Sequence, residues 1–378
     1  MSLKKLPVLL IAALTVIAVG CRKGSEIPAP VITFSFEKDT MHLSVGDSVN
    51  VRAFVDNSVT VQHSWKLNDS LYSTSYDINI VPKAIGTYVL FYSGGNETAT
   101  FTKTITVYVG DRIRPITATS SKYISYVLEY LPAPGQFINE TIADANATQN
   151  IIGETNSLLS LGGYGGYVIF TFDHSIVNKD GMDLAIAGNP LAPPMEWSEP
   201  GIVMVSHDLN GNGLADDEWY ELAGSEYESA STKKNYTITY YNPKDTADVP
   251  WKDNLGDSGV VEINNYHNHN YYPLFAPNQD SISFTGSLLS NTFGMEGSVY
   301  VNKGFNLGYV DNYSAGDNYA QNRYNSFDIS WARDKEGKII TLPAIDFVKV
   351  YTGQNNKGNK VLGEISTEIR GAWDLGMP

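Results

Sequence analysis

Oxygen-bearing side chains recur at alternate positions in the segment DLNGNGLADDEW, residues 208–219. Calcium takes about six to eight oxygen ligands, and a sharply bent chain can supply several of them from one turn. Gly213 permits such a bend because glycine has no Cβ. The sequence therefore predicts calcium as a cofactor. Its expected ligands are the side chains of Asp208, Asn210, Asn212 and Asp216, the carbonyl of Leu214, and Glu218 or Glu221 to complete the shell.

This segment differs from an EF-hand, because its twelfth position is Trp219 instead of a bidentate glutamate. It is more similar to the calcium loops of dockerins and thrombospondin-type repeats. The alternative is a turn rich in Asn and Asp that holds no metal, since Asn-Gly pairs form tight turns by themselves.

His267 and His269 alternate in the segment NNYHNHNYYP, residues 264–273. In an extended chain this spacing places both imidazoles on one face. They could hold a transition metal, coordinate the cobalt of a corrinoid, or hydrogen-bond a ligand. The sequence offers no third ligand at metal-site spacing. Two solvated loop histidines are therefore the commoner outcome, and the pair is kept as a candidate ligand-binding site.

Aromatic residues are abundant, with 24 tyrosines and six tryptophans. Exposed rings stack on sugars and on flat macrocycles, although most rings in a folded protein belong to the core. Rings beside Gly or Pro in loops are the better candidates for a binding platform. The four that we expect there are Tyr164, Trp197, Tyr271 and Tyr272.

Acidic residues gather at 196–221, where a hydrolase could find an acid and a base. They are Glu196, Glu199, Asp216, Asp217, Glu218 and Glu221. The sequence carries no nucleophile motif, phosphate loop or zinc signature. These acids are better explained as calcium ligands and solvated edges, so catalysis is not the leading expectation.

Short alternating apolar and polar runs, bounded by Gly, Pro, Asn or Asp, predict an all-β protein. Residues 31–110 form the first expected domain, in which Trp65 and the sequence Gly86-Thr-Tyr88 are typical of a PKD or immunoglobulin-like sandwich. Residues 111–378 form the second, a larger sandwich of jelly-roll type that carries the ligand site. Its expected strands are 166–172, 201–206, 236–241, 281–284 and 345–351.

The N-terminus predicts export. Two lysines precede an apolar run at 6–19 that is too short to span a bilayer, so residues 1–20 are expected to be a lipoprotein signal peptide. Cys21, the one cysteine, is the expected lipidation site, and 21–30 is the expected tether. A net charge of −15 argues against a nucleic-acid partner. We therefore expect a lipid-anchored protein of the outer membrane, facing the cell surface.

Three segments together resemble the PKD-containing cell-surface lipoproteins of Bacteroidota. They are EYLPAPGQFIN (129–139), the 208–219 segment running on to Leu222, and FDISWA (327–332). Similar proteins occur alongside corrinoid (vitamin B12) uptake systems. The resemblance implies capture of an extracellular nutrient, a corrinoid first, for a TonB-dependent transporter. The alternatives are a glycan-binding or calcium-dependent glycan-degrading protein, and an adhesion or structural protein.

Overall fold

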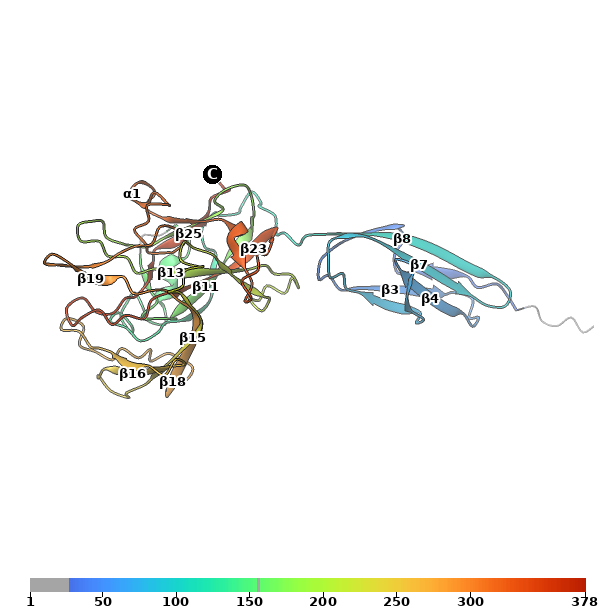
Figure 1. The fold of residues 1–378 in the computed structure, drawn as a ribbon. Coiled ribbons are helices and arrows are strands. Elements are labelled where there is room, and N and C mark those ends of the chain that lie inside the picture. The colour runs from blue at the N-terminus through green and yellow to red at the C-terminus, as the bar shows by residue number, and fades with distance from the viewer. Residues whose placement is uncertain (1–26, 155–156) are drawn as a thin grey trace, which may run out of the picture. The chain divides into compact units, whose positions relative to one another are not determined.

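The computed structural model of the protein describes residues 27–154 and 157–378. The predicted signal peptide and Cys21 lie outside these residues. Two compact units are present, and residues 48–109 and 110–378 make up most of the first and the second. No helix in the described ranges is long and apolar enough to cross a membrane. Each unit is built almost entirely of strands (Figure 1).

The first unit is a sandwich of two sheets. One sheet has the order β1-β3-β6 and the other the order β2-β8-β7-β4-β5. The strands are β1 (Ile32–Phe34), β2 (Thr40–Ser44), β3 (Val49–Val55), β4 (Gln62–Leu67), β5 (Ser70–Ser73), β6 (Asp77–Ile80), β7 (Gly86–Gly95) and β8 (Thr100–Gly110).

The core of this first sandwich is aromatic. Trp65 and Tyr92 face each other across β4 and β7 with ring centroids 4.6 Å apart, and Phe34 meets both rings edge-on. Trp65 is fully buried, and its indole N–H donates to the carbonyl of Ser75 at 3.0 Å, which satisfies the one polar group of the ring. The predicted immunoglobulin-like sandwich is confirmed.

The second unit is centred on a six-stranded sheet of order β22-β14-β13-β23-β11-β9, faced by a three-stranded sheet of order β21-β12-β25. The bounds are β9 (Tyr126–Leu131), β11 (Tyr167–Val177), β12 (Leu184–Ala187), β13 (Gly201–Ser206), β14 (Trp219–Leu222), β21 (Asn325–Phe327), β22 (Ala332–Arg333), β23 (Ala344–Thr352) and β25 (Gly371–Asp374). A two-stranded ribbon joins β10 (Leu159–Ser160) to β24 (Glu368–Ile369).

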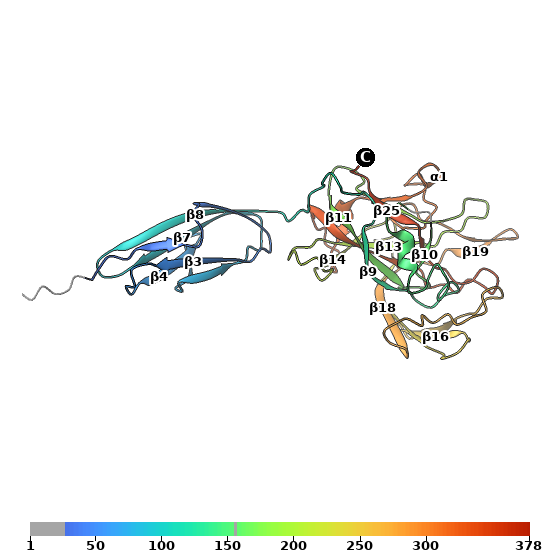
Figure 2. The same cartoon turned by 180° about the vertical axis from the view of Figure 1, so that it is seen from behind.

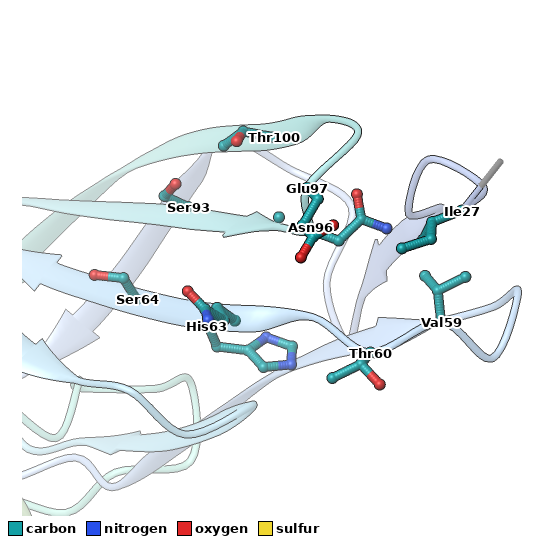
Figure 3. A pocket seen from close by; sticks show the side chains of 11 residues that line it. Ile27, Val59, Thr60, His63, Ser64, Ser93, Asn96, Glu97 and Thr100 are labelled. Carbon is teal, nitrogen blue, oxygen red and sulfur yellow. The ribbon is translucent and has the colours of Figure 1, made fainter. Parts of the chain in front are cut away.

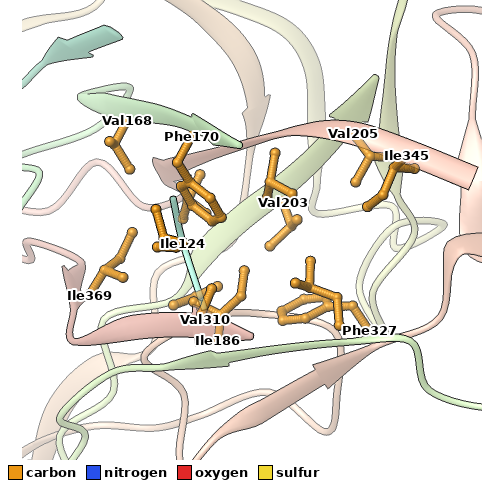
Figure 4. Packing of buried hydrophobic residues seen from close by; sticks show 14 of the residues in the cluster. Ile124, Val168, Phe170, Ile186, Val203, Val205, Val310, Phe327, Ile345 and Ile369 are labelled. Atoms are coloured by element: carbon orange, nitrogen blue, oxygen red, sulfur yellow. The ribbon is translucent and has the colours of Figure 1, made fainter. Parts of the chain in front are cut away.

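Apolar side chains fill the space between these sheets (Figure 4). Val203 and Val205 alternate on β13, Val168 and Phe170 lie on β11, and Phe327 faces them from β21. The central strands are apolar on both faces because both faces are covered, so their sequences read as nearly continuous apolar runs. The all-β sandwich prediction is confirmed for this unit as well.

A third layer was not predicted. Four strands of order β17-β16-β15-β18 form a separate sheet with its own apolar cluster. Its strands are β15 (Lys233–Tyr241), β16 (Val249–Asp253), β17 (Ser258–Val261) and β18 (Ser281–Leu288). Figure 2 shows β16 and β18 on one side of the body that contains β11 and β13. The remaining elements are a hairpin of β19 (Phe293–Glu296) and β20 (Val299–Asn302), the one-turn helix α1 (Tyr319–Asn322), and two 3-10 turns at Ala147–Ile151 and Ile329–Trp331.

Candidate functional site

The segment predicted to bind calcium is the connection between β13 and β14. Asp208 begins it and is buried, and its backbone N–H donates to the carboxylate of Asp346 at 2.8 Å. The side chain of Asp208 accepts backbone N–H groups from residues 211, 212 and 213 at 2.7 to 3.1 Å. Gly211 and Gly213 have φ of +69° and +74°, which side chains with a Cβ rarely adopt. The loop is therefore wrapped around one carboxylate.

The predicted ligands at alternate positions converge in this loop. The side-chain amides of Asn210 and Asn212 donate to the two carboxylate oxygens of Asp216 at 3.0 and 2.9 Å. These two amides lower the pKa of Asp216 below its usual range. Leu214 donates its backbone N–H to the Asn212 side chain at 2.7 Å.

Asp217, which belongs to the predicted acidic group but not to the named calcium ligands, also lies in the loop. It accepts the backbone N–H of Leu209 at 3.1 Å, and burial next to Asp208 and Asp216 raises its pKa. Glu221 instead accepts hydrogen bonds from Lys234 and Ser287 at 3.3 and 2.5 Å, away from the loop. The structure thus brings Asp217 into the loop and directs Glu221 elsewhere.

Glu218 is exposed and accepts the hydroxyl of Tyr220 at 3.2 Å. The loop therefore gathers three carboxylates (Asp208, Asp216 and Asp217) and two side-chain amides. Carboxylate and amide oxygens are the donor types that calcium takes, but the three carboxylates are not grouped around one point in the described structure.

A cleft of about 440 Å³ opens beside the third sheet. Trp251 of β16 lies opposite Gly259 of β17 in register, and a Cβ at Gly259 would lie 2.6 Å from the Trp251 ring. Glycine at this position therefore lets the indole lie across the neighbouring strand. The lining residues are Gly163, Tyr164, Tyr240, Trp251, Ser258, Gly259, Val260, Val261, Asn291, Asn355, Asn356, Lys357 and Glu364.

Polar groups of several elements converge on this cleft. Asn291 and Asn356 hydrogen-bond each other, and Asn355 donates to the hydroxyl of Tyr236 at 3.0 Å. Lys357 is exposed and pairs with Glu262 at 2.6 Å. The cleft thus combines an indole ring with amide, ammonium and carboxyl groups.

Glu364 is the most unusual group in the cleft. Its side chain is buried, Oε1 accepts the backbone N–H of Gln136 at 2.9 Å, and Oε2 has no partner among the described residues. Burial raises the pKa of Glu364 to about 7, so its acid form persists close to neutral pH. Neither Glu364 nor Trp251 was predicted, because no local motif surrounds them.

The predicted aromatic platform is largely wrong. Tyr164 is buried, although it lies among the residues that line the cleft, while Tyr271 and Tyr272 are fully buried in the core under the third sheet. The Tyr271 hydroxyl accepts the backbone N–H of Asn264 at 3.0 Å, so it is satisfied internally. Trp197 is half-buried and packs edge-on against Phe293, outside the cleft. The rings available for stacking are therefore different ones.

His267 and His269 lie in the connection between β17 and β18. Each side chain is less than one third exposed, and both rings face the carboxylate of Glu140. Glu140 is thus a third candidate ligand beside the two histidines, which the spacing of residues in the sequence did not reveal. Tyr271 and Tyr272 are turned into the core and therefore offer no stacking surface beside the pair.

A second acidic cluster is buried. Glu199, Asp311 and Glu368 place carboxylate oxygens within 4.8 Å of one another. Burial, followed by the neighbouring carboxylates, raises the pKa of Glu199 and Asp311 well above the usual range, and burial raises that of Glu368 to about 7. Glu199 is therefore not at a solvated edge, and it lies apart from the Asp208 loop.

The first unit has an open pocket of about 760 Å³ between β4, β7 and the chain entering β1 (Figure 3). His63 lies on its wall, and its Nδ1 is 2.7 Å from the hydroxyl of the core residue Tyr92. The described residues that line this pocket include no Phe, Tyr or Trp. We assign no site to it.

No protein-family model and no curated protein matches the chain. Among solved structures it is similar to the PKD domain of human KIAA0319, at 22% identity over 23% of this chain and 88% of that chain, with a TM-score of 0.19. It is also similar to the SusE-like protein BT2857, at 7% identity over 88% of this chain and 94% of that chain, with a TM-score of 0.20.

A further likeness is to SGBP-B of the Bacteroides ovatus mixed-linkage glucan utilization locus, solved in complex with a mixed-linkage heptasaccharide. The identity is 10% over 82% of this chain and 94% of that chain, with a TM-score of 0.18. Scores this low carry no argument about function. The function of the protein is therefore argued from its own residues.

Proposed function

We propose that the protein is a lipid-anchored surface protein that binds an extracellular glycan in the cleft beside Trp251. The observation that carries this proposal is the combination of one indole with the amides of Asn291, Asn355 and Asn356 around a space of about 440 Å³. That volume lies within the usual range of small-ligand sites.

The chemistry of a sugar matches these groups. A pyranose ring has an apolar face of C–H groups that packs on an aromatic ring, and a rim of hydroxyls that both donate and accept hydrogen bonds. Side-chain amides supply both donors and acceptors. Lys357 adds a donor at the rim of the cleft.

Binding is favoured over hydrolysis. Hydrolysis by the usual mechanism needs two carboxyl groups that flank the scissile bond. Among the described residues that line the cleft, Glu364 is the one carboxylic acid.

Replacing Trp251 by Ala is expected to weaken glycan binding at least about tenfold, because the stacking surface and its buried area are lost together. Titration calorimetry of the mature protein against soluble oligosaccharides, with cyanocobalamin in the same panel, measures this. Trp197→Ala is the matched control, since Trp197 lies outside the cleft and should leave affinity unchanged. Binding of cyanocobalamin alone, or equal glycan affinity in the Trp251 variant, would refute the proposal.

We also propose that the loop starting at Asp208 binds calcium. Asp208, Asp216 and Asp217 would supply carboxylate oxygens, and Asn210 and Asn212 would supply amide oxygens. A bound ion would be coordinated by these oxygens and would thereby hold the connection between β13 and β14 in place.

Calcium is expected to raise the melting temperature of the protein, because a ligand that binds only the folded state stabilises it. The gain is about 2.7 kcal/mol at a hundred times the dissociation constant. Differential scanning calorimetry in EGTA and after calcium is restored measures this increment. Asp216→Asn should remove the increment while leaving the fold intact, because Asp216 is exposed. An identical melting temperature in EGTA and in calcium contradicts the calcium site.

A further inference from the structure

We propose that Glu140, His267 and His269 form a binding site for a zinc ion on the surface of the second unit. This inference does not depend on the proposed glycan site, and it uses none of the residues of the calcium loop. Two observations support it. The segment that carries Glu140 and the segment that carries the two histidines are fixed against each other by hydrogen bonds, and the three side chains then place a carboxylate oxygen beside two imidazole nitrogens.

The histidine segment is held by Asn264. The side-chain oxygen of this buried residue accepts the backbone N–H groups of Tyr266 at 2.8 Å and His267 at 2.7 Å. Its side-chain nitrogen donates to the side chain of Gln136, and its own backbone N–H donates to Tyr271. The backbone that carries the histidines is therefore anchored at a buried point.

The segment that carries Glu140 is joined to the same region by Asn139. The side-chain nitrogen of Asn139 donates to the carbonyls of Asn270 and Tyr272 at 2.8 and 2.9 Å. Its side-chain oxygen accepts the backbone N–H of Leu274 at 3.0 Å. Asn139 has φ of +70°, which turns the chain at the residue before Glu140. The carboxylate of Glu140 is thus brought to the histidines by backbone contacts, independently of any attraction between the side chains.

The three side chains meet at one point. Oε1 of Glu140 lies 3.1 Å from Nδ1 of His267 and 3.0 Å from Nε2 of His269, and all three atoms lie within 4.8 Å of one another. Ligands about 2.0 to 2.1 Å from a tetrahedral zinc ion are ~3.3 Å apart. Small rotations of the side chains would therefore admit the ion.

The hydrogen bonds around His269 also match a metal ligand. Its Nδ1 lies 3.1 Å from the carbonyl of Asn270, and in the tautomer that carries the proton on this nitrogen it donates to that carbonyl. Metal-bound histidines usually donate their other ring N–H in this way. The lone pair of Nε2 then points towards Glu140 and towards the carbonyl of Gln136, 3.0 Å away. In this tautomer an imidazole lone pair meets carboxylate and carbonyl oxygens, an arrangement that a bound cation would stabilise.

The donor set selects the type of ion. Two imidazole nitrogens and one carboxylate oxygen are the ligands of open zinc sites, in which water takes the fourth position. Calcium would prefer oxygen donors throughout. The side chains of His267, His269 and Glu140 are 28%, 29% and 39% exposed, so an ion and a water molecule can reach them.

The mature protein is first freed of metal. Calcium is then restored, so that any calcium site in the Asp208 loop is filled before zinc is added. Titration with zinc is expected to give one equivalent of tight binding, and cobalt(II) is expected to give the visible spectrum of a four-coordinate ion. His267→Ala, His269→Ala and Glu140→Gln should each weaken zinc binding by at least about tenfold. Glu140→Gln keeps the size of the side chain, so its fold should be retained.

His42→Ala is the matched control, because His42 stacks on Tyr108 in the first unit. It should bind zinc as the unchanged protein does. A zinc affinity that is the same in all four variants, or a cobalt spectrum typical of six-coordinate aqueous ion, would overturn the site. In that case the three side chains form a hydrogen-bonded imidazole–carboxylate cluster only.

Discussion

The free energy of unfolding of the second unit is expected to fall as the pH rises from about 4.5 through 7. Glu364 and Glu368 are buried, and both have a pKa near 7 in the folded protein against an ordinary value of 4.5. Below the ordinary pKa these carboxyl groups are protonated in both states, so their burial carries no charge. As the pH passes the folded pKa, the folded state must hold a buried carboxylate that the unfolded chain would leave in water. The loss is about 3 kcal/mol for each group.

Melting temperatures measured by calorimetry from pH 4.5 to 8.5 test this expectation. Glu364→Gln should flatten the upper part of the profile and raise stability at pH 8, because the amide keeps an acceptor for the N–H of Gln136 and cannot ionise. Glu97→Gln, at an exposed site in the first unit, is the control. If the Glu364 variant follows the same profile as the unchanged protein, Glu364 does not titrate in this window.

Replacing Asp346 by Ala is expected to lower the free energy of unfolding by about 3 to 5 kcal/mol. Asp346 lies on β23 and is buried, and its Oδ1 accepts Nε of Arg114 at 2.9 Å and the hydroxyl of Ser175 at 2.6 Å. Its Oδ2 accepts the backbone N–H of Asp208. The variant would leave a guanidinium, a hydroxyl and an amide without their acceptor, which costs more than the loss of an exposed ion pair.

Urea unfolding followed by tryptophan fluorescence measures this effect, since five of the six tryptophans belong to the second unit. Asp280→Ala, in the same unit, removes a largely exposed partner of Lys244 and should change the free energy of unfolding far less. Because Asp346 also fixes the start of the Asp208 loop, Asp346→Ala should weaken calcium binding as well. A loss of stability as small as that of the Asp280 variant would show that the network contributes little.

The strands could be predicted from the sequence where a continuous apolar run marked a central strand. The predicted strand 201–206 coincides with β13, and 345–351 lies within β23, because continuous apolar runs bounded by Gly, Pro or Thr mark central strands. In the third sheet, the predicted strands 236–241 and 281–284 lie within β15 and β18, whereas β16 and β17 were missed because β16 contains Pro250, β17 contains Gly259, and both are short. Such strands depend on their neighbours more than on their own pattern.

The candidate sites were likewise predictable where all their residues lie in one short segment, and not where they come from distant segments. The Asp208 loop could be found because its oxygen donors lie within ten residues of one another. Glu140 could not be assigned to the histidines, since tertiary hydrogen bonds such as those of Asn139 and Gln136 bring the two segments together. Proximity to Gly or Pro did not reveal that Tyr271 and Tyr272 turn inwards, because the direction of a loop side chain is decided by tertiary packing.

The pairing of β11 with β23 and of β10 with β24 has a kinetic consequence. Leu159 lies opposite Ile369, and Tyr167 opposite Tyr351, so the central sheet closes only when segments from distant parts of the chain meet. Closing such long loops costs entropy before any contact compensates for it, which places folding in the millisecond-to-second range or slower. Until β23 arrives between them, β11 and β13 present open edges, and this is the interval in which the chain is most prone to aggregate.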